Sequence, residues 1–142
     1  MEFKIIDKNT GEDKIFSNDA IADFLEVHLG RFGDKKDDIL KCLKYVFNKG
    51  GFIAVAVDSD ELLGATVINE TGMDGYIPEN VLVYIAVHES QRGKGVGSKL
   101  MQKAIDQAKG SIALHVEADN PAKKLYESLG FTNKYLEMRL QR

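Results

Sequence analysis

The sequence predicts a single α/β domain built on a mixed β-sheet, and three observations point to this fold class. Residues 81–87 form an unbroken run of seven apolar residues, which is typical of a strand buried on both faces. A glycine-rich turn follows at residues 91–97, and the apolar residues beyond it recur with helical spacing. Residues 111–116 predict the next strand, and a strand-helix-strand order of this length implies a right-handed parallel crossover.

Before this central unit, the sequence predicts an N-terminal strand and a β-hairpin. Residues 3–6 open the chain as a short strand. Residues 52–57 and 62–68 are rich in β-branched residues and alanine, and a polar turn separates them. These two segments therefore predict an antiparallel pair, and residues 70–80 form a loop that leads to the central strand.

Two helices are expected between the first strand and the hairpin. Ser17 or Asn18 can cap the first helix, and Gly30 is placed to end it. The second helix begins among residues 34–38 and stops at Gly50. The apolar positions that define the two helical faces are Ile21, Phe24, Leu25, Leu29, Ile39, Leu40, Leu43, Val46 and Phe47.

A short helix and a terminal strand are predicted at the end of the chain. Asn120 can cap this helix, with Pro121 at its first position and Gly130 just beyond its end. Residues 132–140 predict a terminal strand or a pair of short ones. The predicted order is strand, helix, helix, three strands, helix, strand, helix, strand, in one domain over residues 1–142.

Composition excludes several classes of protein. Hydrophobic residues make up 44% and charged residues 29% of the chain, which is ordinary for a soluble domain. The longest apolar run is too short for a membrane helix and the N-terminus lacks a signal peptide, so we expect a cytoplasmic protein without membrane attachment. The single cysteine, Cys42, excludes an intramolecular disulfide and is predicted to lie in the core.

The net charge of −3 is unevenly distributed along the chain. Residues 1–80 contain 9 Lys and Arg against 16 Asp and Glu, a balance of −7, and residues 81–142 contain 10 against 6, a balance of +4. An acidic region raises the local concentration of cations and repels anions. The alternative is a solvated surface without a role in binding.

The glycine-rich turn has the composition of a phosphate site. It lies at a helix N-terminus, where the first backbone N–H groups lack partners and carry partial positive charge. Gly93, Gly95 and Gly97 would allow close approach of a ligand oxygen and permit positive φ, and Arg92 and Lys94 add full charges. The spacing matches neither a P-loop nor a dinucleotide-binding fingerprint. An ordinary strand-helix turn is the alternative interpretation.

The strand and its turn resemble motif A of the GNAT family of N-acetyltransferases. That motif is a strand followed by Gln/Arg-x-x-Gly-x-Gly/Ala, and residues 92–97 fit it at every specified position. The resemblance implies a GNAT-like (acyl-CoA N-acyltransferase) fold, with a mixed, mostly antiparallel sheet flanked by helices. It also implies that the turn holds the pyrophosphate of acetyl-CoA and that Ile85 and Val87 pair with the pantetheine arm.

A second segment, residues 120–131, resembles motif B of the same family. The usual pattern is Asn-x-x-Ala-x-x-Leu-Tyr-Glu-x-Leu-Gly-Phe, and the chain matches it fully from Ala122 to Phe131. Asn120 precedes Ala122 by two positions instead of three, so either Asn120 or Asp119 fills the first position. The residues that the resemblance assigns to acetyl-CoA binding are Ile85, Ala86, Val87, Arg92, Gly93, Lys94, Gly95, Val96, Gly97, Ser98, Asn120 and Tyr126.

The chemistry of thioester aminolysis explains these residue types. The resemblance makes Tyr126 the catalytic acid, and a phenol with a pKa near 10 stays protonated at neutral pH and can meet a departing thiolate. The resemblance also makes the backbone N–H of Val87 the expected donor to the carbonyl oxygen. The central strand has no carboxylate, so the general base stays open among Glu79, His88, His115 and Glu117. A core position for the Tyr126 ring is the alternative to catalysis.

These features predict an enzyme that moves an acetyl group from acetyl-CoA to a primary amine in a ternary complex. The acidic half favours a cationic amine or a peptide amine as acceptor. We expect no metal and no nucleic acid, and the resemblance allows a homodimer. Two alternatives are a CoA-binding sensor or subunit with weak chemistry, and an unrelated phosphate or nucleotide binder. The acidic residues available around the acceptor are Asp23, Glu26, Asp34, Asp37, Asp38, Asp74 and Glu79.

Overall fold

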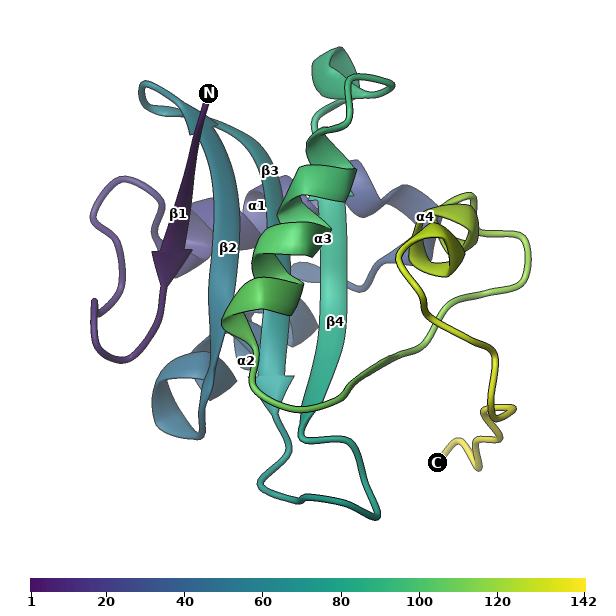
Figure 1. Cartoon of the computed structure of the whole chain (residues 1–142). Helices are drawn as coiled ribbons and strands as arrows, with labels where there is room; N and C mark the ends of the chain where they lie inside the picture. The colour runs from purple at the N-terminus through teal and green to yellow at the C-terminus, as the bar shows by residue number, and fades with distance from the viewer.

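A five-stranded sheet forms the centre of the computed structural model, which describes residues 1–142 (Figure 1). The strands are β1 (Glu2–Ile6), β2 (Gly51–Asp58), β3 (Glu61–Glu70), β4 (Asn80–Val87) and β5 (Ile112–Leu114), and they lie in this order across the sheet. The first three pairings are antiparallel, and β5 lies parallel to β4. The predicted mixed, mostly antiparallel sheet is confirmed.

Two layers of helices cover the sheet, one on each face (Figure 1). The helices are α1 (Asn18–Leu29), α2 (Lys36–Asn48), α3 (Val96–Gln107) and α4 (Ala122–Ser128), with short 3₁₀ turns η1 (Gly30–Phe32) and η2 (Glu89–Gln91). The helices α1 and α2 pack on one face, and α3 crosses the other with α4 beside it. None of these helices is long and apolar enough to cross a membrane.

The two faces of the sheet have separate cores, which explains the unbroken apolar strands. The core under α1 and α2 contains Ile21, Leu25 and Leu43, and the core under α3 contains Leu100 and Met101. All five side chains are fully buried, as their helical spacing predicts. Strands between two such layers must be apolar on both sides, because both sides are removed from water.

Local signals at the helix ends are confirmed. The side chain of Ser17 accepts a hydrogen bond from the N–H of Ala20, and Gly30 adopts a φ of 57° at the end of α1. Cys42 is partly buried against the core under α1 and α2, and burial raises the pKa of its thiol to about 12. These positions agree with the caps and the core position predicted above.

The predicted terminal strand over residues 132–140 is wrong. No strand follows α4, and β5 spans three residues instead of the expected six. Because a strand needs a partner for its backbone groups, the short β5 offers little edge on which a further ladder could form. The apolar residues of this segment are largely exposed, and they are Tyr135, Leu136, Met138 and Leu140.

The strands β4 and β5 part soon after they meet. They pair over Asn80 to Leu82 on β4 and lose their pairing beyond that point. At the same place, the register between β3 and β4 shifts so that Val67 faces Tyr84 and Ile68 faces Leu82. Val83 is therefore a β-bulge, and a bulge bends its strand and increases the local twist. The rest of β4 runs on with its outer edge open.

Asn80 closes the paired end of the two strands. Its side chain is buried and donates to the carbonyls of Lys109 at 2.7 Å and Ser111 at 3.2 Å. The carboxylate of Glu79 accepts from the N–H of Ser111 at 2.7 Å. These bonds hold the start of β5 against the start of β4, so the opening between the strands has one fixed end.

Replacing Asn80 with alanine should destabilise the protein by about 1–3 kcal/mol, because the carbonyl of Lys109 would lose its buried donor. Asn48→Ala, at the exposed end of α2, is the matched control and should stay within about 0.5 kcal/mol of wild type. Urea unfolding followed by circular dichroism measures both. Equal unfolding midpoints for the two variants would contradict the role of Asn80.

Candidate functional site

The start of α3 presents a cluster of unpaired backbone N–H groups. Lys99 donates the first helical hydrogen bond, to the carbonyl of Gly95 at 3.1 Å. The residues whose N–H groups have no partner in the protein are Gly93, Gly95, Val96, Gly97 and Ser98. Such groups carry the positive end of the helix dipole and form an anion site. The structure thus brings together the amides that the sequence predicted.

The three glycines of the turn serve two different purposes. Gly93 and Gly95 have φ angles of 77° and 80°, which favour glycine. Gly97 does not have positive φ, so that part of the prediction is wrong. A Cβ atom at Gly97 would lie 3.5 Å from Leu125 and 3.6 Å from Val87, between α4 and the open end of β4. Its lack of a side chain keeps this space free.

The basic residues of the turn are available to a ligand. Arg92 and Lys94 are exposed, and neither forms an ion pair. Arg92 has one long contact, from its guanidinium to the carbonyl of His28 at 3.5 Å. His88 stabilises the segment that leads into the turn, because its Nδ1 accepts a hydrogen bond from the N–H of Ser90. Two free cations therefore border the unpaired amides.

The open edge of β4 leads directly to this turn. The N–H of His88 donates to the carbonyl of Leu63 on β3 at 2.8 Å, so the backbone groups of Ala86 also point toward β3. Those of Ile85 and Val87 point the opposite way, toward the edge that β5 leaves open. Of the three predicted β4 residues, Ile85 and Val87 offer free backbone groups, whereas the Ala86 side chain lies in the core under α1 and α2.

Tyr126 lies on the α3 side of the sheet. The residue is 7% exposed, and its ring packs 6.0 Å from that of Phe131. Burial raises the pKa of Tyr126 to about 12, so the phenol keeps its proton at neutral pH. Its hydroxyl makes no hydrogen bond to another residue and is not fully covered. The group is therefore both protonated and free to donate.

The two residues before α4 have different partners. Asn120 caps the helix, with its side-chain oxygen accepting from the N–H of Ala122 at 2.9 Å. Its amide nitrogen is left free to donate. Asp119 forms an ion pair with Arg31 of η1 at 2.9 Å, and the hydrogen bond from Arg31 lowers the pKa of Asp119. This geometry favours Asn120 for the position that the sequence left open.

The candidates for a general base differ in how many hydrogen bonds their side chains already form. Backbone N–H groups of Ser111 and Gly75 hold Glu79, and the first of these bonds lowers the pKa of its carboxyl group. Glu79 is therefore a poor proton acceptor. His115 and Glu117 are exposed in the segment that follows β5, and their side chains have no protein partner.

Several features of this region carry no recognisable signal in the sequence. The bulge at Val83 lies inside an apolar run that contains neither glycine nor proline, so no local signal marks it. The rings of His28 and His88 lie 4.7 Å apart, and burial lowers the pKa of His28. Such contacts join residues far apart in the chain, and only the fold brings them together.

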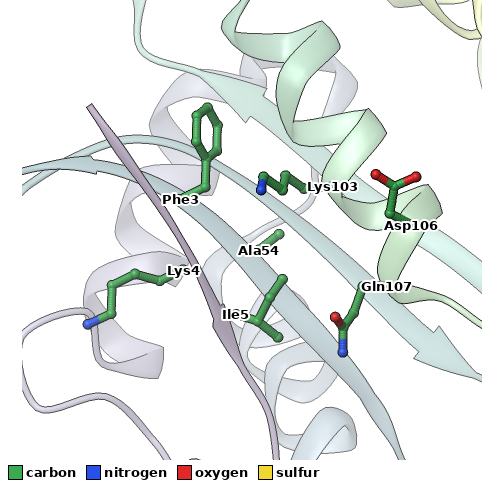
Figure 2. A pocket seen from close by; sticks show the side chains of 7 residues that line it. All are labelled: Phe3, Lys4, Ile5, Ala54, Lys103, Asp106 and Gln107. Atoms are coloured by element: carbon green, nitrogen blue, oxygen red, sulfur yellow. The ribbon is translucent and has the colours of Figure 1, made fainter.

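A separate hollow of about 240 Å³ lies between β1 and α3 (Figure 2). Figure 2 shows side chains from β1, β2 and α3 around it. Because β1 is the opposite edge strand of the sheet, this hollow is distinct from the opening beside β4. Its lining residues are Phe3, Lys4, Ile5, Ala54, Lys103, Asp106 and Gln107.

Comparison with known proteins agrees with this geometry. Residues 17–131 match the family model described as the acetyltransferase (GNAT) family. The chain belongs to this family. The resemblance seen in the two motifs is therefore confirmed, and acetyl-CoA is the co-substrate of the family.

Individual proteins resemble the chain in sequence or in fold. The chain is 33% identical over 85 residues to N-alpha-acetyltransferase 30 of Schizosaccharomyces pombe, a stretch covering 56% of this chain and 57% of that protein. A structure described as a probable acetyltransferase has a TM-score of 0.74 and 22% identity, covering 100% of this chain and 98% of the other. A ribosomal-protein-alanine N-acetyltransferase from Brucella melitensis biovar Abortus 2308 has a TM-score of 0.66 and 14% identity, covering 99% and 98%.

Replacing Gly97 with aspartate should weaken CoA binding at least about tenfold, because a carboxylate would lie beside the unpaired amides. Gly97→Ala is the matched control, since its methyl group would make ordinary van der Waals contacts with Leu125 and Val87. Isothermal titration with CoA measures both variants. A folded Gly97→Asp protein that binds CoA as tightly as wild type would contradict the phosphate site.

Proposed function

We propose that this GNAT protein transfers the acetyl group of acetyl-CoA to a primary amine by direct attack in a ternary complex. The observation that carries the proposal is the continuity between the open edge of β4 and the unpaired amides at the start of α3. A linear molecule with a phosphate group at one end and amide groups along its length matches both parts. Acetyl-CoA has this form, and the family uses it.

Each part of the donor has suitable partners on this chain. The unpaired amides of Gly93 and of residues 95–98, with the side chains of Arg92 and Lys94, would bind the pyrophosphate through hydrogen bonds and charge. The backbone groups of Ile85 and Val87 would pair with the pantetheine amides as a neighbouring strand does. The free amide nitrogen of Asn120 would donate to a pantetheine carbonyl from the opposite side of the opening.

The reaction then needs three groups. The amine nitrogen forms a bond to the acetyl carbon, the carbon–sulfur bond breaks, and the amine loses a proton. The N–H of Val87 would stabilise the negative carbonyl oxygen. Tyr126 would give its proton to the departing thiolate, a role that its free hydroxyl and raised pKa support. His115 or Glu117, whose side chains have no protein partner, would act as the base, directly or through water.

A positively charged acceptor is favoured by the charge distribution. Helices α1 and α2 belong to the half of the chain with a balance of −7, and they cover the face of the sheet opposite α3. Attraction of this kind raises the local concentration of a cation. The relative named as an N-alpha-acetyltransferase supports a peptide α-amine as one such acceptor.

A CoA-binding protein without efficient chemistry is the second candidate. The observation in its favour is that β4 carries no carboxylate that could act as a base. Such a protein would bind CoA through the same amides but release no thiol when amines are added. Thiol release by the wild-type protein in the presence of amines separates the two candidates.

Tyr126→Phe should lower turnover by roughly 10²-fold while CoA affinity stays nearly constant, because the change removes only the hydroxyl group. Thiol release from acetyl-CoA with a panel of peptide amines and polyamines gives turnover, and calorimetric titration gives affinity. Tyr135→Phe, at an exposed position in the C-terminal segment, is the control. Equal turnover in wild type and Tyr126→Phe would assign Tyr126 to the core alone.

A further inference from the structure

Asp34 and Tyr84 form a hydrogen-bonded pair on the side of the sheet opposite α3. We propose that Asp34, held in position by Tyr84, binds the ammonium group of the acceptor. The inference rests on the proposed function and deepens it, because it assigns a residue to acceptor recognition. Asp34 would be a binding residue, and Tyr84 a positioning residue that acts through it.

The pair connects the central strand to the segment between η1 and α2. The hydroxyl of Tyr84 donates to Oδ2 of Asp34 at 2.5 Å, across 50 positions of sequence. Tyr84 is 7% exposed within the core, whereas Asp34 is exposed. Burial and the neighbouring carboxylate both raise the pKa of Tyr84, so the phenol remains a donor. A fixed ring therefore holds an exposed carboxylate in one place.

The location of the pair matches the route that an acceptor would take. Leu82 is the last residue of β4 that pairs with β5, Val83 is the bulge, and Tyr84 follows directly. The phosphate turn and Tyr126 lie toward the α3 face, which the donor would occupy. The Tyr84 side chain lies in the core under α1 and α2. An acceptor that enters from the side of α1 and α2 would therefore meet Asp34 beside the bulge.

Most of the other acidic residues that the sequence analysis placed around the acceptor already have partners. Asp23 pairs with Lys36 at 2.8 Å and Asp38 with Lys41 at 3.6 Å. The other two engaged carboxylates are Glu26, which accepts from a backbone N–H of α2, and Glu79, which accepts from Ser111. Asp37 and Asp74 have no partner, but neither is attached to β4.

Asp34 differs from Asp23 and Asp38 because its one partner is neutral, and it differs from Glu26 and Glu79 because that partner is a side chain of β4. A phenol satisfies part of the hydrogen-bonding capacity of a carboxylate and leaves its charge uncompensated. Anchoring the segment to the sheet would require only an acceptor oxygen, which an asparagine also supplies. The negative charge of Asp34 is therefore not needed to hold this segment against the sheet. An ammonium group would satisfy it with charge-assisted hydrogen bonds.

The test compares three variants with the acceptor that gives the fastest thiol release in wild type. The panel consists of short peptides with a free N-terminal amine, and spermidine. Asp34→Asn keeps an acceptor oxygen for Tyr84 and removes the charge, and Tyr84→Phe keeps the ring and removes the donor. Asp60→Asn is the matched control, because it removes one charge from the exposed turn between β2 and β3. Initial rates at saturating acetyl-CoA, in low and high salt, give kcat and KM for the acceptor.

Asp34→Asn should raise the acceptor KM by roughly 10-fold to 100-fold and leave the KM for acetyl-CoA unchanged. In wild type and in Asp60→Asn, salt should raise the acceptor KM, and in Asp34→Asn most of this dependence should be lost. Tyr84→Phe should raise the acceptor KM less but keep the salt dependence, since the charge remains. A purely structural role would not change the salt dependence.

The failures of the two proposals are distinguishable. If wild type binds CoA but releases no thiol with any amine, the proposed acetyl transfer is wrong, and the inference is overturned with it. If wild type is active and Asp34→Asn matches Asp60→Asn in KM and salt dependence, only the assignment of Asp34 is wrong. A fastest acceptor without positive charge would also overturn the assignment. Circular dichroism confirms that each variant is folded.

Discussion

The open outer edge of β4 is the constraint on which the rest of the structure depends. Backbone N–H and C=O groups inside a protein are almost always paired, and β4 supplies its own pairs on only one side beyond Leu82. The bulge at Val83 opens this edge, and the bonds from Asn80 keep the other end closed. A ligand with backbone-like amides is thereby offered the place of a missing strand. The fold creates the site by leaving its sheet incomplete at one place.

The helix α3 adds a second set of unpaired groups at the end of the same edge. Its first amides are free because Gly95, in a left-handed conformation, turns the chain without contributing a capping side chain. A capping Ser or Asp at this position would occupy the amides and place an oxygen in the phosphate position. The turn therefore leaves uncapped a helix start that most proteins cap, and the ligand would act as the cap.

Local features of the chain could be predicted from the sequence, and long-range ones could not. The cap at Ser17, the glycine turn and the helical faces depend on residues within a few positions of one another. The bulge at Val83, the Asp34–Tyr84 bond and the Arg31–Asp119 pair depend on contacts across 50 or more positions or on the twist of the whole sheet. The prediction of a terminal strand is wrong for a related reason. Alternating apolar and polar residues form a strand only where a partner edge exists.

The two faces of the sheet divide the chemistry between them. The α3 face carries the amides, the free cations and Tyr126, and these groups suit an anionic donor and a departing thiolate. The opposite face carries the acidic helix α1, and the pair of Asp34 and Tyr84 lies next to the bulge. Charges of opposite sign on opposite faces would direct donor and acceptor to different entrances. Under the proposed function both entrances would meet where β4 and β5 part, so acetyl transfer would require both substrates to be bound at once.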